Sequence, residues 1–188
     1  DWIGQVREVV KAGNPERELG VRVGTSIDGS CSVGLDPVTW IEQGLVDVVT
    51  AETMAMMSLI DASANFRPLL EVAAGSSCRV VAGLRNMVDS DRLGHATIEM
   101  VRAAATNYWS QGVDGLCMIH WYGNWPYDGA FYERLRELPH PELMAARDKF
   151  YFVPTPGGRM RDEAPIDHGL SWQLPAELKL NQPVALQL

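Results

Sequence analysis

The sequence predicts an α/β protein: the C-terminal half of a (β/α)8 TIM barrel, four βα units, followed by the beginning of a β-sandwich-like domain. Four short apolar segments begin near positions 20, 45, 79 and 113, with helical patterns between them. Apolar strands that alternate with helices form parallel sheets. Each strand also ends near a polar side chain, and barrel enzymes build their sites on that rim. These rim residues are Asp28, Glu52, Asn86 and His120.

The predicted elements follow in order along the chain. Apolar residues at i, i+3 and i+4 spacing predict a first helix over 2–12, and Gly13 to Pro15 end it. The first strand spans 20–27 and runs into a polar turn at 28–30; Asp36 and Pro37 then begin a short helix over 38–43. The remaining elements are a strand at 45–50, a helix at 65–74, a strand at 79–84, a helix at 91–111 and a strand at 113–119.

A local sequence pattern occurs twice. Trp40-Ile-Glu-Gln-Gly-Leu-Val-Asp47 matches Trp109-Ser-Gln-Gly-Val-Asp114, and each copy leads from a helix through glycine into a strand. Glycine ends helices in this way because it tolerates a positive φ. The repetition supports a βα-repeat architecture.

The C-terminal part differs in composition from the rest. After a last short helix at 139–149, residues 154–167 are rich in proline, glycine and charge, and 184–188 alternate between apolar and polar. We therefore expect the barrel half over 1–153, a linker over 154–169, and the start of an incomplete β-domain over 170–188.

An open nucleotide-binding sheet is less consistent with the sequence than a barrel, because neither GxGxxG nor GxxxxGK[ST] is present. A barrel needs eight strands. We therefore expect the first half of the barrel to lie upstream of Asp1 and to be the partner of this half. A lone half, with two exposed sheet edges, should be poorly soluble or pair with itself.

Charge and composition exclude several classes of function. The net charge of −8 and the absence of a basic stripe argue against nucleic-acid binding. No apolar run reaches the roughly 18 residues of a membrane span. The three cysteines lack CxxC spacing, and no second histidine or cysteine stands at ligand spacing from His120, so no metal site is expected.

Several motifs together resemble bacterial glycosyl-hydrolase-like barrel proteins, which are related to family-ten-like glycosidases. The resemblance covers most of 20–188. The similar segments are Gly34-Leu-Asp with Trp40-Ile and Gly44-Leu-Val-Asp47, then Ala103 to Met118, Leu143 to Tyr151, and Gln173-Leu-Pro175. The resemblance implies a carbohydrate-active barrel followed by an accessory β-domain, and it favours an exported or periplasmic location.

Glycoside hydrolysis generally needs two carboxyl groups beside the scissile bond. Glu52, directly after an apolar strand, is the first catalytic candidate, and Asp28 is the second. Glu52 has an alternative role as a rim carboxylate paired with Arg22 or Arg85, and Asp28 as a turn residue. The related glycosidases carry a glutamate after their seventh strand, where this chain has Arg85-Asn86. This departure implies either that the acid–base pair is placed differently or that the barrel binds without cleaving.

Substrate-binding candidates surround these carboxylates. Arg85 and Asn86 suit hydrogen bonds to sugar hydroxyls, and Arg85 also suits an ion pair with a carboxylated sugar. The alternative role of these residues is to neutralise Glu52. The aromatic segment 112–132 suits sugar rings, whose C–H faces pack on aromatic planes; alternatively, some rings fill the barrel end. From this segment we select His120, Trp121, Tyr122, Asn124, Trp125 and Tyr127.

The sequence therefore predicts a glycoside-hydrolase-like protein that acts on a poly- or oligosaccharide at the carboxyl rim of a TIM barrel and needs no cofactor. Two alternatives remain open. One is a carbohydrate-binding barrel without catalysis. The other is a flavin or phosphate-ligand barrel, which ranks lowest because a Gly-rich phosphate loop is missing after the third and fourth strands.

Overall fold

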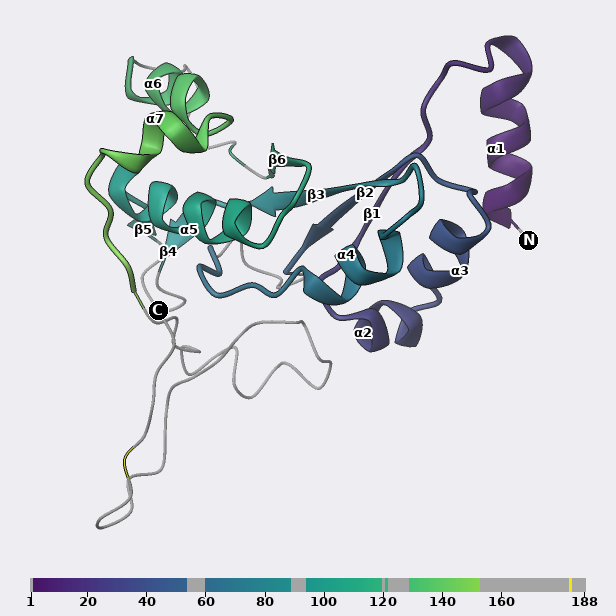
Figure 1. Cartoon of the computed structure of the whole chain (residues 1–188), viewed down its shortest axis with the longest axis horizontal. Coiled ribbons are helices and arrows are strands. Elements are labelled where there is room, and N and C mark those ends of the chain that lie inside the picture. The colour runs from purple at the N-terminus through teal and green to yellow at the C-terminus, as the bar shows by residue number, and fades with distance from the viewer. Residues whose placement is uncertain are drawn as a thin grey trace.

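The structure, a computed structural model, describes residues 2–53, 60–88, 94–119, 121, 129–152 and 183. In these ranges the chain is a mixed α/β fold around a four-stranded parallel sheet (Figure 1). The strands are β1 (Gly20–Gly24), β2 (Val48–Glu52), β3 (Arg79–Leu84), β4 (Met87–Val88), β5 (Gly94–His95) and β6 (Gly115–Met118). The helices are α1 (Trp2–Gly13), α2 (Ile27–Ser32), α3 (Pro37–Glu42), α4 (Arg67–Ala73), α5 (Ile98–Ser110), α6 (Gly129–Glu137) and α7 (Pro141–Ala145).

The main sheet has the order β1-β2-β3-β6, so neighbouring strands follow one another along the chain without a reversal. Crossover connections between parallel strands are right-handed, and an unreversed order therefore puts the connecting helices on one face. Burial agrees, since Val23, Val49 and Val80 are fully buried whereas Thr50 and Val81, which alternate with them, are partly exposed. The sheet thus has one covered face and one more open face.

Helices α3, α4 and α5 supply much of the core that covers the sheet (Figure 1). Phe66 and Tyr108 are both buried and meet edge to face, with ring centroids 4.8 Å apart. Such an aromatic pair contributes about 0.5–1.5 kcal/mol beyond its buried area. Other core residues from these helices are Ile41, Leu69, Ala73, Val101, Ala104 and Ala105.

The repeated helix-glycine-strand pattern forms the same structure twice, as predicted. Gly44 and Gly112 have φ values of 63° and 95°, which residues other than glycine rarely adopt. After each glycine, an aspartate accepts a hydrogen bond from the backbone of a neighbouring strand segment: Asp47 from the Leu19 amide at 2.7 Å, and Asp114 from the Val80 amide at 2.8 Å. Each aspartate therefore fixes the register at the amino edge of the sheet.

The first strand is shorter than predicted. It ends at Gly24, and the Ser26 hydroxyl then accepts a hydrogen bond from the Gly29 amide and caps α2. Asp28 consequently lies in the first turn of a helix, and the prediction of a strand end with a polar turn at 28–30 was wrong. The reason is local: a serine cap satisfies a free amide at a helix start and stabilises a helix even over a short segment.

The predicted long helix at 91–111 is also shorter and begins at Ile98, where the Thr97 side chain accepts a hydrogen bond from the Met100 amide. Residues 94–95 instead form β5, which pairs antiparallel with β4. A second difference is α6, which contains Phe131 and Tyr132. The sequence placed these rings in an aromatic loop.

The predicted linker and the predicted β-domain, 154–169 and 170–188, lie outside the described residues except for Pro183. Within the described ranges, no helix combines the length and hydropathy needed to cross a lipid bilayer.

Candidate functional site

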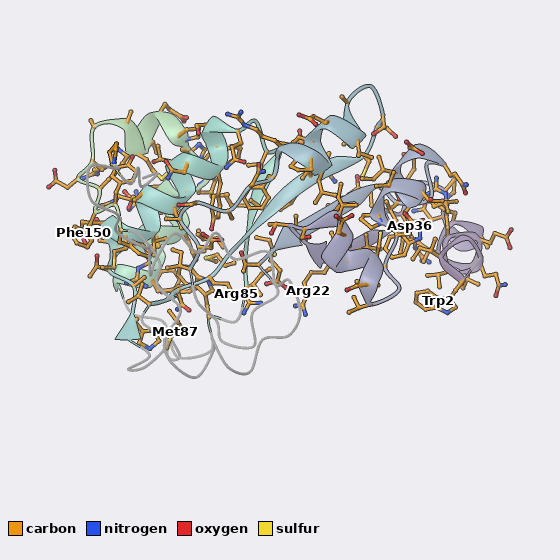
Figure 2. All side chains as sticks on the ribbon, turned by 90° about the horizontal axis from the view of Figure 1, so that it is seen from below. Trp2, Arg22, Asp36, Arg85, Met87 and Phe150 are labelled. Atoms are coloured by element: carbon orange, nitrogen blue, oxygen red, sulfur yellow. The ribbon has the colours of Figure 1, made fainter. Side chains whose placement is uncertain are left out.

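The candidate site is centred on Glu52, the last residue of β2, whose side chain is fully buried. Its Oε2 accepts a hydrogen bond from Arg85 Nε at 3.0 Å and lies 2.7 Å from Arg85 Nη2 in an ion pair. Its Oε1 lies 2.9 Å from Arg22 Nε, an ion pair outside hydrogen-bond geometry. Figure 2 labels both arginines, which lie next to each other where they meet this carboxylate. Residues from β1, β2 and the end of β3 thus form one charged cluster.

Strand register explains how distant residues meet at Glu52. Arg22 pairs with Thr50 and Gly24 pairs with Glu52, so Arg22 and Glu52 project from the same face of the sheet. On β3, a methyl group at Gly83 would lie 2.6 Å from Glu52 Cβ. The lack of a side chain at Gly83 therefore makes room for Glu52 between the strands.

Two guanidinium groups surround one buried carboxylate, and removal of that carboxylate would leave a buried arginine without its counter-charge. Arg85 is itself buried, whereas Arg22 is 52% exposed. The cluster carries one negative and two positive charges, so its solvent-facing side is cationic.

Cys117 lies on the same face as this cluster, opposite Gly83 on the neighbouring strand. Burial raises the pKa of the Cys117 thiol, the Glu52 carboxylate raises it further, and Arg22 partly opposes them. The thiol is therefore protonated at neutral pH and does not serve as a thiolate nucleophile.

Asn86 follows Arg85 at the carboxyl end of β3 and is also buried. Its backbone carbonyl accepts a hydrogen bond from the Ala96 amide at 2.7 Å, which fixes the start of the β4–β5 hairpin.

The contacts of Arg85 match the alternative that the sequence left open, in which this arginine neutralises Glu52.

Trp121 is 6% exposed and belongs to the core. Its Nε1 donates a hydrogen bond to the Leu84 carbonyl at 2.8 Å, and its ring meets Phe131 edge to face at 6.1 Å. The Arg134 guanidinium lies 5.8 Å from the ring centroid. For Trp121 these contacts favour packing between β3 and α6, the second of the two roles that the sequence allowed, over an exposed platform for sugar rings.

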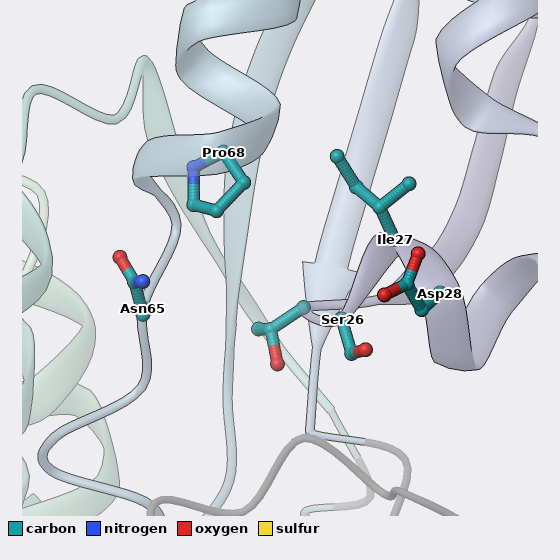
Figure 3. A pocket seen from close by; sticks show the side chains of 6 residues that line it. Ser26, Ile27, Asp28, Asn65 and Pro68 are labelled. Atoms are coloured by element: carbon teal, nitrogen blue, oxygen red, sulfur yellow. The ribbon is translucent and has the colours of Figure 1, made fainter.

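Asp28, the second catalytic candidate, lines a pocket of about 330 Å³ at the carboxyl end of β1. Figure 3 shows Asn65 and Pro68 on one side of this pocket and Ser26, Ile27 and Asp28 on the other. Thr25 completes the lining, and its amide donates a hydrogen bond to the Glu52 carbonyl at 3.0 Å. The pocket therefore adjoins the strand that carries Glu52.

Sequence reasoning missed Thr25, Ser26, Asn65 and Pro68 as pocket residues. Asn65 was placed inside a helix, whereas it precedes α4 and its Oδ1 accepts a hydrogen bond from the Arg67 amide at 3.2 Å. Asn65-Phe-Arg-Pro68 is the local signal that could have revealed it, since a proline in the first turn marks a helix start, which here lies two residues after Asn65.

Asp61 is a further buried carboxylate that the sequence did not indicate. Its Oδ2 accepts a hydrogen bond from the Thr53 hydroxyl at 3.3 Å, directly after β2, and its Oδ1 accepts one from the Ser63 amide at 3.1 Å. Its backbone carbonyl accepts a hydrogen bond from the Tyr108 hydroxyl at 2.5 Å. These contacts hold the segment after β2 against α5.

The other predicted binding residues, His120, Tyr122, Asn124, Trp125 and Tyr127, lie outside the described residues. In the described ranges, no group of three or more His, Cys, Asp or Glu side chains is arranged to hold a metal ion. No protein-family model matches the sequence, and no curated protein matches it significantly.

Proposed function

We propose that this chain is a glycoside-hydrolase-like protein that acts on a poly- or oligosaccharide at the carboxyl edge of its parallel sheet. The observation that carries the proposal is the cluster of Arg22, Glu52 and Arg85, which gathers charged side chains from β1, from β2 and from the residue directly after β3. Ligands of parallel α/β folds bind outside the carboxyl ends of the strands.

The two arginines paired with Glu52 restrict the chemistry that this residue can perform. A carboxylate held by two arginines is a poor general acid, because the acid must be protonated at the working pH. It suits the other role in glycoside hydrolysis, in which an ionised carboxylate attacks or stabilises the positively charged sugar carbon of the transition state. In this mechanism the proton donor is a second residue.

Binding without hydrolysis is the second candidate function, and a specific observation favours it. The Glu52 side chain is fully buried, and both of its oxygens face guanidinium groups at 3.0 Å or less. In this case Glu52 positions Arg22 and Arg85, and the arginines and the neighbouring pocket hold the sugar.

We also propose that the four strands are half of a (β/α)8 barrel, completed by a second set of four βα units. The strand order supports this, because it runs without the reversal that marks a doubly wound sheet. The open face of the sheet supports it as well, because Thr50, Val81 and Cys117 on this face are only partly buried. In a complete barrel, side chains on this face would point into the interior and be covered by the other four strands.

The test is a panel of oligosaccharides and polysaccharides assayed both for binding and for release of new reducing ends. For hydrolysis we expect Glu52→Gln to lower turnover by orders of magnitude while binding persists. For binding alone we expect no turnover in the unmodified protein, and weaker binding in Glu52→Gln because both arginines lose their anchor. Glu18→Gln is the matched control, since Glu18 also pairs with an arginine, Arg79 at 2.6 Å, but is exposed.

The control variant should behave as the unmodified protein in both assays. A circular dichroism spectrum must show that Glu52→Gln keeps its secondary structure, because breaking a buried ion pair costs about 3–5 kcal/mol. Arg22→Gln, which leaves the Arg85 pair intact, serves as the milder variant. If neither binding nor turnover occurs with any glycan, the proposal is wrong.

A further inference from the structure

We propose that the pocket at the carboxyl end of β1 binds a single, uncharged sugar ring and discriminates against acidic sugars. The pocket is lined by Thr25, Ser26, Ile27, Asp28, Asn65 and Pro68. This inference rests on the proposed function, and it names the class of substrate for that site.

The size of the pocket limits the ligand. Its volume of about 330 Å³ lies at the lower end of the roughly 300–1,000 Å³ of small-molecule sites. That space accommodates one ring with its hydroxyls and leaves the rest of a glycan chain outside. The pocket opens between the turn that enters α2 and the segment that enters α4 (Figure 3), so both of its sides come from helix starts.

Internal hydrogen bonds hold the polar lining in place. Ser26 Oγ accepts a hydrogen bond from the Gly29 amide at 3.0 Å, and Asn65 Oδ1 accepts one from the Arg67 amide. Thr25 is buried and tied to β2 through the Glu52 carbonyl. Side chains that are already ordered lose little conformational entropy when a ligand binds.

The chemistry of the lining fits a sugar ring. Asp28 offers carboxylate oxygens that accept hydrogen bonds from hydroxyls, and the Asn65 amide nitrogen donates hydrogen bonds. Ile27 and Pro68 add apolar surface on opposite sides of the pocket (Figure 3), which suits the C–H faces of a ring. A ligand with hydroxyls around its edge and C–H groups on its faces uses both kinds of lining.

The charge of the lining excludes acidic sugars. Asp28 is the charged residue among the six that line the pocket, and in the described part of the chain it forms no ion pair. A ligand carboxylate a few ångströms from Asp28 would meet like charge without a compensating cation. At partly solvated distances of this kind the repulsion corresponds to a loss of affinity of about tenfold.

The experiment uses the full chain with the methyl glycosides of glucose, galactose and mannose, and with glucuronic and galacturonic acid as matched acidic probes. Ligand-observed NMR titration measures each affinity. We expect at least one neutral methyl glycoside to bind, with the acid of the same ring configuration at least about tenfold weaker. Asp28→Asn should weaken the neutral sugar and remove most of the discrimination, whereas Glu42→Gln, an exposed acid on α3 outside the pocket, should change neither.

A second variant keeps the test independent of any folding defect in Asp28→Asn. Asn65→Asp retains the oxygen that accepts from the Arg67 amide and adds a negative charge to the pocket, so it should increase the discrimination against the acids. If acids bind as tightly as neutral rings, or if no single ring binds although the protein binds or cleaves longer glycans, this inference is wrong and the proposed function stands. If no glycan of any length binds, both are wrong.

Discussion

Gly83 offers a direct test of how closely the strands pack around Glu52. The substitution Gly83→Ala would place a methyl group 2.6 Å from Glu52 Cβ, 2.7 Å from Ile119 Cδ1 and 3.1 Å from the Ala51 carbonyl oxygen. Real Cβ contacts essentially never fall below 3.0 Å, so β2 or β3 must shift by at least about 0.4 Å. Because Glu52 Cβ and the Ala51 carbonyl lie on a buried strand, no flexible side-chain end can absorb this shift.

Overpacking of this kind costs about 1–3 kcal/mol of unfolding free energy. For a chain of this length, 1 kcal/mol corresponds to roughly 2–4 °C in melting temperature, so Gly83→Ala should melt about 2–12 °C lower than the unmodified protein. Thermal and urea unfolding followed by circular dichroism measure the change. The same variant should disturb ligand binding, because it displaces the carboxylate that Arg22 and Arg85 hold.

Gly115→Ala is the matched control. Gly115 lies on β6, the next strand, and projects from the same face, but a methyl group there would meet its nearest neighbour, Val81 Cγ2, at an ordinary 3.6 Å. The loss of backbone freedom in the unfolded chain should even stabilise this variant by about 0.4–1 kcal/mol. If Gly83→Ala proves as stable as Gly115→Ala, the close approach of β2 and β3 described above is wrong.

Two further predictions concern contacts outside the pocket and the charged cluster. Burial tends to raise the pKa of Asp47, but the Leu19 amide, Lys11 and Arg7 more than offset this and hold the pKa below its ordinary value. The resulting stability is present above about pH 4 and is lost as the pH falls through the lowered pKa. Asp47→Asn should therefore cost about 0.5–1.5 kcal/mol at pH 7 and progressively less as the solution is acidified below about pH 4. Urea unfolding across this pH range measures the cost, and a pH-independent difference would contradict it. Tyr108→Phe removes the buried hydrogen bond to the Asp61 carbonyl and should cost about 1–2 kcal/mol in thermal unfolding. Burial raises the pKa of Tyr108, which keeps the hydroxyl protonated, so this cost should be equal at pH 6 and pH 9; a cost that changes between these values would contradict the role as a donor.

The alternation of strands and helices could be predicted from sequence because it depends on local patterns. The strand Arg79–Leu84 has the predicted bounds, and both helix-glycine-strand joints form with positive φ at Gly44 and Gly112. In each joint the signal lies within eight consecutive residues. The position of Glu52 at the carboxyl end of its strand could be predicted for the same reason, because the apolar run before it ends there.

The competition between helix and strand at short polar segments could not be resolved from local pattern alone. Asp28 followed an apparent β-rich run, yet the Ser26 cap draws Ile27 and Asp28 into α2. Likewise, residues 94–95 lie within a helical pattern but pair with β4, because the Asn86 carbonyl and the Ala96 amide bring the two short strands together. Whether such a short segment becomes helix or strand depends on a pairing partner that lies several residues away along the chain.

The sequence by itself determined that this chain is an α/β protein with parallel strands, and that a carboxylate stands at the end of β2. Only the tertiary structure decided what surrounds that carboxylate. Arg22 and Arg85 are 30 and 33 residues from Glu52 along the chain, and strand register together with the missing side chain at Gly83 brings all three together. Packing likewise placed Trp121 against the Leu84 carbonyl in the core, because burial of an aromatic ring depends on neighbours that no local spacing encodes.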